Sequence, residues 1–188
     1  METGIPFRLI AFIVASAGIV FVSRKSLRAP RSHGFYRFFA WELMLVSFFL
    51  VVDRWFDDES RWNQIVSSVL LIGSLVPLTL GIRALVARGK PAPRREGEPQ
   101  LLSFEKTTTL VTTGIYRYIR HPLYCSLLLV TGGIFFKAPS VLAGSLALAT
   151  TVLLVATAKA DEAECIRYFG PAYEELMQRT RMFLPFVF

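Results

Sequence analysis

Two groups of charged side chains stand out in this 188-residue chain, one cationic and one anionic. The cationic group, Arg120 and His121, lies directly before Pro122, where a polar stretch meets a long apolar run. Because a residue before proline avoids helical dihedrals, we expect His121 to be extended and a helix to start at Pro122. The N-terminal amides of such a helix favour an anion. The anionic group follows the next apolar run and comprises Asp161, Glu162 and Glu164.

The two groups flank one predicted helical hairpin, so we expect them to face each other across a pocket. Such a pocket suits a zwitterion, with a carboxylate near Arg120 and His121 and a cation near the acidic side chains and the faces of tyrosine rings. S-adenosylmethionine has this character, together with an adenine that needs apolar walls. Methyl transfer from it is an in-line displacement that depends mainly on positioning. From the residues alone, a lipid-binding protein that contacts lipid phosphates is an equally good interpretation.

The composition indicates a membrane protein. Hydrophobic residues make up 53% of the chain, charged residues 19%, and the mean hydropathy is +0.47. Several runs approach the 20 or so apolar residues that cross a bilayer. The net charge of +7 comes largely from basic residues in loops beside these runs. Membrane topology and anionic lipid explain that placement better than nucleic acid, which we do not expect as a partner.

The hydrophobic pattern predicts an all-α, polytopic membrane protein with about five transmembrane helices. The expected spans are 5–22, 35–52, 65–86, 122–136 and 139–158. The basic loop after the first span is expected in the cytoplasm, which places the N-terminus outside and the C-terminus inside. His33 lies in this loop and is expected to be an exposed side chain.

Proline, glycine and basic residues at 88–97 predict a linker. It separates an N-terminal three-span region, residues 1–97, from a second region, residues 98–188, that carries both charged groups. In the second region we expect an extended segment at 101–113 and a turn at Gly114. No cysteine or histidine spacing fits a metal site, and none is expected.

The last expected span continues into water as far as Phe169, because glycine and proline at 170–171 typically end one helix and start another. Residues 171–181 should then form a cytoplasmic amphipathic helix. Residues 182–188 are apolar and are expected to return to the membrane surface. With five spans, both charged groups lie on the cytoplasmic side.

Four motifs between Leu110 and Pro185 are specific in combination. They are Leu110–Tyr116 (LVTTGIY), Arg120–Tyr124 (RHPLY), the acidic pair Asp161-Glu162, and Phe169-Gly170 with Tyr173. Together they resemble the isoprenylcysteine carboxyl methyltransferase and phospholipid methyltransferase superfamily. The resemblance implies an integral membrane enzyme that uses S-adenosylmethionine on the cytoplasmic side and takes a lipidic or prenylated acceptor from the bilayer.

The resemblance also implies a set of cofactor contacts. Arg120, His121 and Tyr124 would hold the amino-acid end, and Asp161 with Glu162 would close the pocket. The remaining expected contacts are Thr108, Thr109, Leu110, Val111, Tyr116, Pro122 and Leu123. No residue is assigned as a catalytic base. Carboxyl methyltransferases of this superfamily carry an arginine where this chain has Thr157, so a carboxylate, an amine and a thiol all stay open as methyl acceptors.

Overall fold

A computed structural model describes residues 4–56, 61–90, 102 and 105–184. Within these ranges the chain forms helices and one isolated parallel bridge, between Ile119 and Arg181, with no strand. The α-helices are α1 (Gly4–Ser23), α2 (His33–Val51), α3 (Trp62–Arg88), α4 (Pro122–Lys137), α5 (Val141–Phe169) and α6 (Pro171–Arg179). Short 3-10 helices lie between them: η1 (Ser26–Arg28), η2 (Val52–Arg54) and η3 (Gly114–Arg117).

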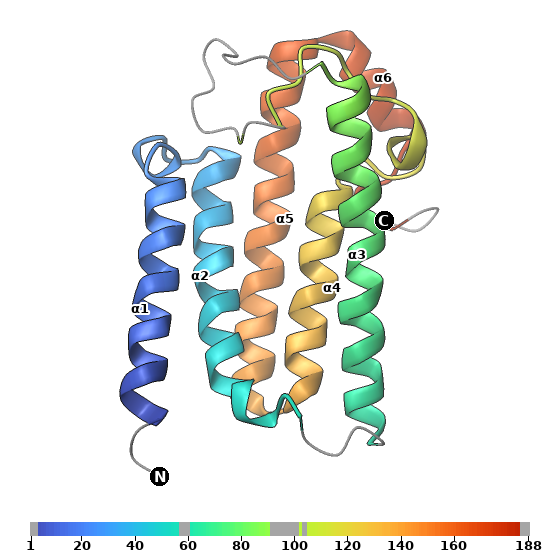
Figure 1. Ribbon diagram of the computed structural model, residues 1–188. Helices are drawn as coiled ribbons and strands as arrows, with labels where there is room; N and C mark the ends of the chain where they lie inside the picture. Colours follow the sequence, from blue (N-terminus) through green and yellow to red (C-terminus); the bar gives the residue numbers. More distant parts are fainter. Residues whose placement is uncertain (1–3, 57–60, 91–101, 103–104, 185–188) are drawn as a thin grey trace.

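Helices α1 to α5 stand side by side, with α6 and residues 105–121 gathered at one end (Figure 1). Helix α3 packs mainly against α4 and α2 mainly against α5, while α1 packs against α2. The outward faces carry large apolar side chains, such as Ile72, Leu148 and Val152. Three helical segments are long and apolar enough to cross a membrane, at His33–Arg54, Trp62–Arg88 and Val141–Phe169; Phe7–Ser23 and Pro122–Lys137 are shorter apolar helices. The predicted all-helical, polytopic membrane architecture is confirmed.

Local sequence signals explain where the helices begin and end. Ser32 caps α2 by accepting a hydrogen bond from the Phe35 amide at 3.2 Å, and Ser140 caps α5 in the same way. Helix α5 runs without a break to Phe169, as predicted, and ends at Gly170. This residue has φ 59°, a conformation that glycine adopts at little cost, and Pro171 then opens α6.

Helix α4 is much shorter than its neighbours, and this difference creates the space for a site. It has 16 residues, whereas α3 has 27 and α5 has 29. At 1.5 Å per residue, α4 is about 16–20 Å shorter than the helices beside it. Helix α4 therefore begins below the ends of α3 and α5, and residues 105–121 together with α6 lie above it (Figure 1).

Close contact with α3 fixes the start of α4. A Cβ atom placed on Gly81 of α3 would lie 3.1 Å from the Pro122 ring and 3.2 Å from the Leu123 side chain. Further along, the Ser67 hydroxyl donates to the Gly133 carbonyl at 2.7 Å. Small residues on both helices thus let the two backbones approach closely, a common feature of packed membrane helices.

The segment after α6 differs from expectation. Met182 and Phe183 were expected at the membrane surface but are buried in the core with Ile119, Tyr124, Cys125 and Ala158. The Ile119–Arg181 bridge draws them in, because backbone hydrogen bonds pair this segment with the residues just before α4. Residues 185–188, and 91–97 of the expected linker, lie outside the described residues.

The opposite end of the bundle is tied together by polar side chains. The Asn63 and Gln64 amides donate to the carbonyls of Phe136 and Lys137 at the end of α4, both at 3.1 Å. The Lys137 ammonium, on a residue only 7% exposed, donates to Gln64 Oε1 at 2.9 Å and to the Trp55 carbonyl at 3.3 Å. Its ammonium also lies 5.2 Å from the centre of the Trp55 ring.

Candidate cofactor site

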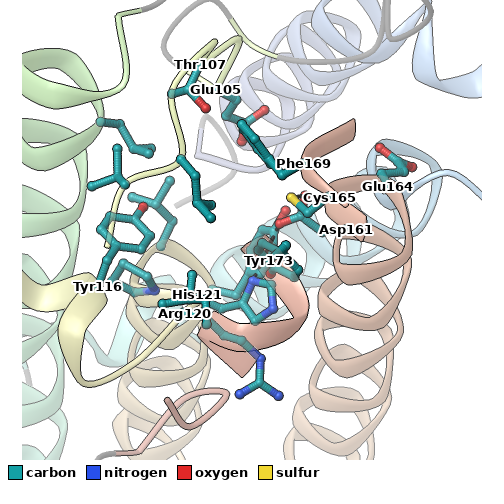
Figure 2. A pocket seen from close by; sticks show the side chains of 17 residues that line it. Glu105, Thr107, Tyr116, Arg120, His121, Asp161, Glu164, Cys165, Phe169 and Tyr173 are labelled. Carbon is teal, nitrogen blue, oxygen red and sulfur yellow. Dashed lines mark hydrogen bonds and ion pairs between the residues drawn. The ribbon is translucent and has the colours of Figure 1, made fainter. Parts of the chain in front are cut away.

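A cavity of about 90 Å³ lies above the N-terminus of α4. Figure 2 shows its lining, which comes from α4, α5, α6, the end of α3 and the segment from Glu105 to Arg120. One wall carries carboxylates from α5 and from this segment, and the others are largely apolar and aromatic. The lining residues are Leu85, Glu105, Thr107, Leu110, Val111, Tyr116, Arg120, His121, Pro122, Leu123, Tyr124, Asp161, Glu164, Cys165, Phe169, Tyr173 and Leu176.

The main chain holds Arg120 and His121 in place. The Arg120 amide donates to the Arg181 carbonyl at 2.9 Å, and the His121 amide donates to the Met182 carbonyl at 3.2 Å. In return, the Arg181 amide donates to the Tyr118 carbonyl at 3.1 Å. The helix starts at Pro122 as predicted, whereas His121, expected to be extended, has φ −124° and ψ 59°, which lies outside the extended region.

The cationic and anionic groups predicted from the sequence meet in direct contact. Arg120 donates through Nε to Glu162 and through Nη1 to the Thr180 carbonyl at 2.8 Å. The two ring nitrogens of His121 each face a carboxylate: Nε2 lies 3.3 Å from Glu162 and Nδ1 lies 3.5 Å from Asp161. The hairpin of α4 and α5 brings the two groups together as predicted, but they pair directly instead of facing each other across a pocket.

The environment of His121 favours its charged form. Burial alone would lower the pKa of this imidazole, but hydrogen bonds and charges from Asp161 and Glu162 outweigh burial and raise the pKa above 6.5. The ring also stacks on Tyr124, with 5.4 Å between ring centres. His121 is thus held between two carboxylates and an aromatic face, an environment that favours its protonated form.

Helix α2 contributes a second pair of ionic contacts that the sequence did not suggest. His33 was expected to be exposed, but it is completely buried. Its amide and its Nδ1 contact the two carboxylate oxygens of Glu164, at 2.9 and 2.6 Å. One turn later, Arg37 Nη1 donates to Glu105 Oε1 at 2.6 Å. His33 was misjudged because its partner lies 131 residues away along the chain, where no local pattern reveals it.

Tyrosines and apolar side chains complete the cavity. Burial raises the pKa of the Tyr116 and Tyr173 phenols well above the usual value, with smaller contributions from nearby groups that include Asp161, so both stay protonated. Both residues are buried, at 8% and 4% exposed. The apolar part of the lining is Leu85, Leu110, Val111, Pro122, Leu123, Phe169 and Leu176. This mixture can hold a ligand with a flat apolar part and a charged part.

Most of the residues predicted from the sequence lie around this one cavity, but three do not line it. Thr108 and Thr109 lie just outside the lining, where their amides donate to the Gly89 carbonyl. Thr107 lines the cavity instead. Glu162 lies behind the lining, in contact with Arg120 and His121.

Sequence reasoning did not assign several lining residues to the cofactor. Helical spacing from Asp161 would have found three of them, because residues three, four and eight positions later share its face: Glu164, Cys165 and Phe169. Glu105 has no comparable signal. In the part of the chain that the structure describes, no group of three metal-ligating side chains occurs.

Comparison with known proteins gives one match. Residues 100–171 match the family model of phospholipid methyltransferases. This segment contains the LVTTGIY and RHPLY motifs, the acidic pair and Phe169-Gly170, so the resemblance to this superfamily is confirmed there. The match supports a membrane methyltransferase of the superfamily without specifying its acceptor. Neither the curated proteins nor the solved structures give a significant match.

Proposed function

We propose that this protein is an integral membrane methyltransferase that uses S-adenosylmethionine to methylate a lipidic or prenylated acceptor. The observation that carries the proposal is the cavity between α4, α5 and α6, which is lined by the motifs of the matched segment. Residues 98–188 would form the cofactor-binding region, and residues 1–97 would mainly anchor it in the bilayer.

The residues around the cavity fit the parts of this cofactor. Arg120 and His121 supply positive charge for its carboxylate, next to the N-terminal amides of α4. Asp161 and the ring of Tyr124 suit its cationic groups. Leu110, Val111 and Leu123 would form apolar walls for adenine. When bound, the cofactor supplies an electrophilic methyl group, and the protein contributes positioning and exclusion of water.

Binding requires the cavity to widen. Pockets for small ligands typically measure about 300–1,000 Å³, well above the 90 Å³ present here. Helix α6, which has nine residues, and residues 105–117, which precede the backbone pairing with residues 181–182, cover the cavity. We expect these two elements to move apart while α4 stays packed on α3. We expect the ligand-bound protein to differ there.

The acceptor would enter from the bilayer beside α4. No described lining residue is a cation in addition to Arg120 and His121, and both of these are assigned to the carboxylate of the cofactor. Thr157, where related carboxyl methyltransferases carry arginine, is fully buried and bonds to the carbonyl of Leu153 at 2.7 Å. This arrangement favours an amine or thiol acceptor over a carboxylate, on the cytoplasmic side of the membrane.

Calorimetry on the purified protein in detergent or lipid tests the proposal. The wild-type protein should bind S-adenosylmethionine and S-adenosylhomocysteine, and His121→Ala should weaken binding several-fold. Arg117→Ala, in the same segment but exposed, is the matched control and should bind as the wild type does. Absence of binding to the wild-type protein would refute the proposal.

A second experiment identifies the acceptor and tests the non-enzymatic alternative. Labelled methyl groups from S-adenosylmethionine should appear in a whole-lipid extract incubated with the protein, and the labelled product names the acceptor. A lipid-binding protein would instead be stabilised by lipid headgroup analogues and not by S-adenosylhomocysteine.

A further inference from the structure

We infer that His33 is a positioning residue for the cofactor pocket: it holds the Glu164 carboxylate in the pocket wall from helix α2. This inference extends the proposed function to the N-terminal half of the chain. That half lies outside residues 100–171, which match the methyltransferase family.

The contact between His33 and Glu164 is unusually complete. Both carboxylate oxygens of Glu164 are engaged by the same residue, one by the His33 amide and one by Nδ1. The amide belongs to the first residue of α2, where the helix dipole also favours a carboxylate. His33 is 0% exposed and Glu164 is 4% exposed, so water does not replace these bonds.

His33 also lies beside a second carboxylate of the pocket wall. Its Nε2 is buried with no hydrogen-bond partner among the described atoms, and it lies 3.9 Å from Glu105 Oε2. Glu105 is itself held by Arg37 at 2.6 Å and accepts a hydrogen bond from the Leu102 amide at 2.9 Å. One imidazole thus stands between Glu164 on α5 and Glu105 on the segment that covers the pocket.

The contacts from α2 help to balance the negative charges in the pocket wall. Glu105, Asp161 and Glu164 all line one small cavity, and unpaired carboxylates in such a place would repel each other and rearrange. His121 compensates Asp161 and Arg37 compensates Glu105, while His33 satisfies both oxygens of Glu164 with hydrogen bonds. Without α2, the wall would lose both its shape and its charge balance.

Substitutions at His33 separate positioning from general stability. Asparagine places its amide nitrogen near the position of Nδ1 and can still donate to Glu164, whereas glutamine reaches toward the position of Nε2. We expect His33→Asn to bind S-adenosylhomocysteine as the wild type does, while His33→Gln and His33→Ala bind about tenfold more weakly. Ser32→Ala, which removes the cap of α2 one residue earlier, is the control: it should lower Tm and leave the affinity unchanged.

A second measurement needs no ligand. Cys165 lines the pocket next to Glu164 on α5. Its alkylation rate therefore reports whether this part of the pocket wall keeps its position. His33→Gln loses the hydrogen bond to the charged Glu164 carboxylate, whereas His33→Asn keeps it. Cys165 should therefore be alkylated about tenfold faster in His33→Gln than in the wild-type protein or in His33→Asn. Equal rates in the Asn and Gln variants would overturn the inference, whatever the protein binds. If the rates differ but the wild-type protein binds no S-adenosylhomocysteine, the proposed function fails and the role of His33 stands.

Discussion

The two ends of the helix bundle use buried charge in different ways. At the end with the cavity, each buried cation contacts a carboxylate, as Arg120 contacts Glu162 and His33 contacts Glu164. At the opposite end, Lys137 donates to neutral oxygens of Gln64 and Trp55, and no ion pair of Lys137 occurs among the described residues. Ion pairs that surround a cavity can recognise a charged ligand. The Lys137 ammonium, which donates to carbonyl oxygens, mainly stabilises the turns at its end of the bundle.

The first prediction tests whether the acidic pair is functional, and it carries the largest expected effect. Replacing Asp161 and Glu162 by Asn and Gln should reduce methyl transfer by about a hundredfold or more, because the partners of His121 and Arg120 are lost. Far-ultraviolet circular dichroism should show intact helices. Glu174→Gln with Glu175→Gln, on exposed positions of α6, removes the same charge away from the cavity and should leave turnover unchanged. Full activity of the first variant would place the cofactor elsewhere.

The second prediction concerns the opposite end. Lys137→Met should lower the free energy of unfolding by about 1–3 kcal/mol, because Gln64 Oε1 and the Trp55 carbonyl lose their donor in a buried place. The affinity for S-adenosylhomocysteine should stay within about twofold, a change of less than 0.5 kcal/mol. Denaturation in mixed micelles and calorimetry measure the two quantities. A large loss of affinity would show that the two ends of the bundle are coupled. It would contradict the interpretation that Lys137 serves stability only.

The third prediction is the smallest and concerns pH. Burial disfavours the charged His121 ring, yet Asp161 and Glu162 raise its pKa in the folded protein above 6.5. Its contribution to stability is therefore fully present below pH 6.5 and is lost as the pH rises through the folded-state pKa. Tm should fall over that range more steeply in the wild-type protein than in His121→Gln. Parallel slopes for the two proteins would contradict a charged His121.

Local patterns predicted most of the fold. The apolar runs, the proline after His121 and the glycine-proline step after Phe169 correctly located, within a few residues, the six α-helices of the described part of the chain. These signals depend on neighbouring residues only, which is why they can be read from one sequence. The LVTTGIY and RHPLY motifs and the acidic pair likewise led to residues that lie around one cavity.

What the sequence did not reveal depends on contacts between distant segments. His33 looked like a polar loop residue, and only the packing of α2 on α5 buries it against Glu164. Met182 and Phe183 looked like a membrane-surface segment, but backbone pairing with the residues before α4 draws them inside. The pocket between the charged groups was predicted, but its place above a short α4 follows from the unequal lengths of three neighbouring helices rather than from any motif.

The backbone pairing between residues 118–121 and 181–182 has a consequence for recognition. Since the His121 amide is already bonded to the Met182 carbonyl, the loop that carries this histidine is ordered before a ligand arrives. Ordering this loop therefore costs little binding free energy. The entropic cost of binding a ligand arises mainly from α6 and the segment that covers the cavity, which must move apart.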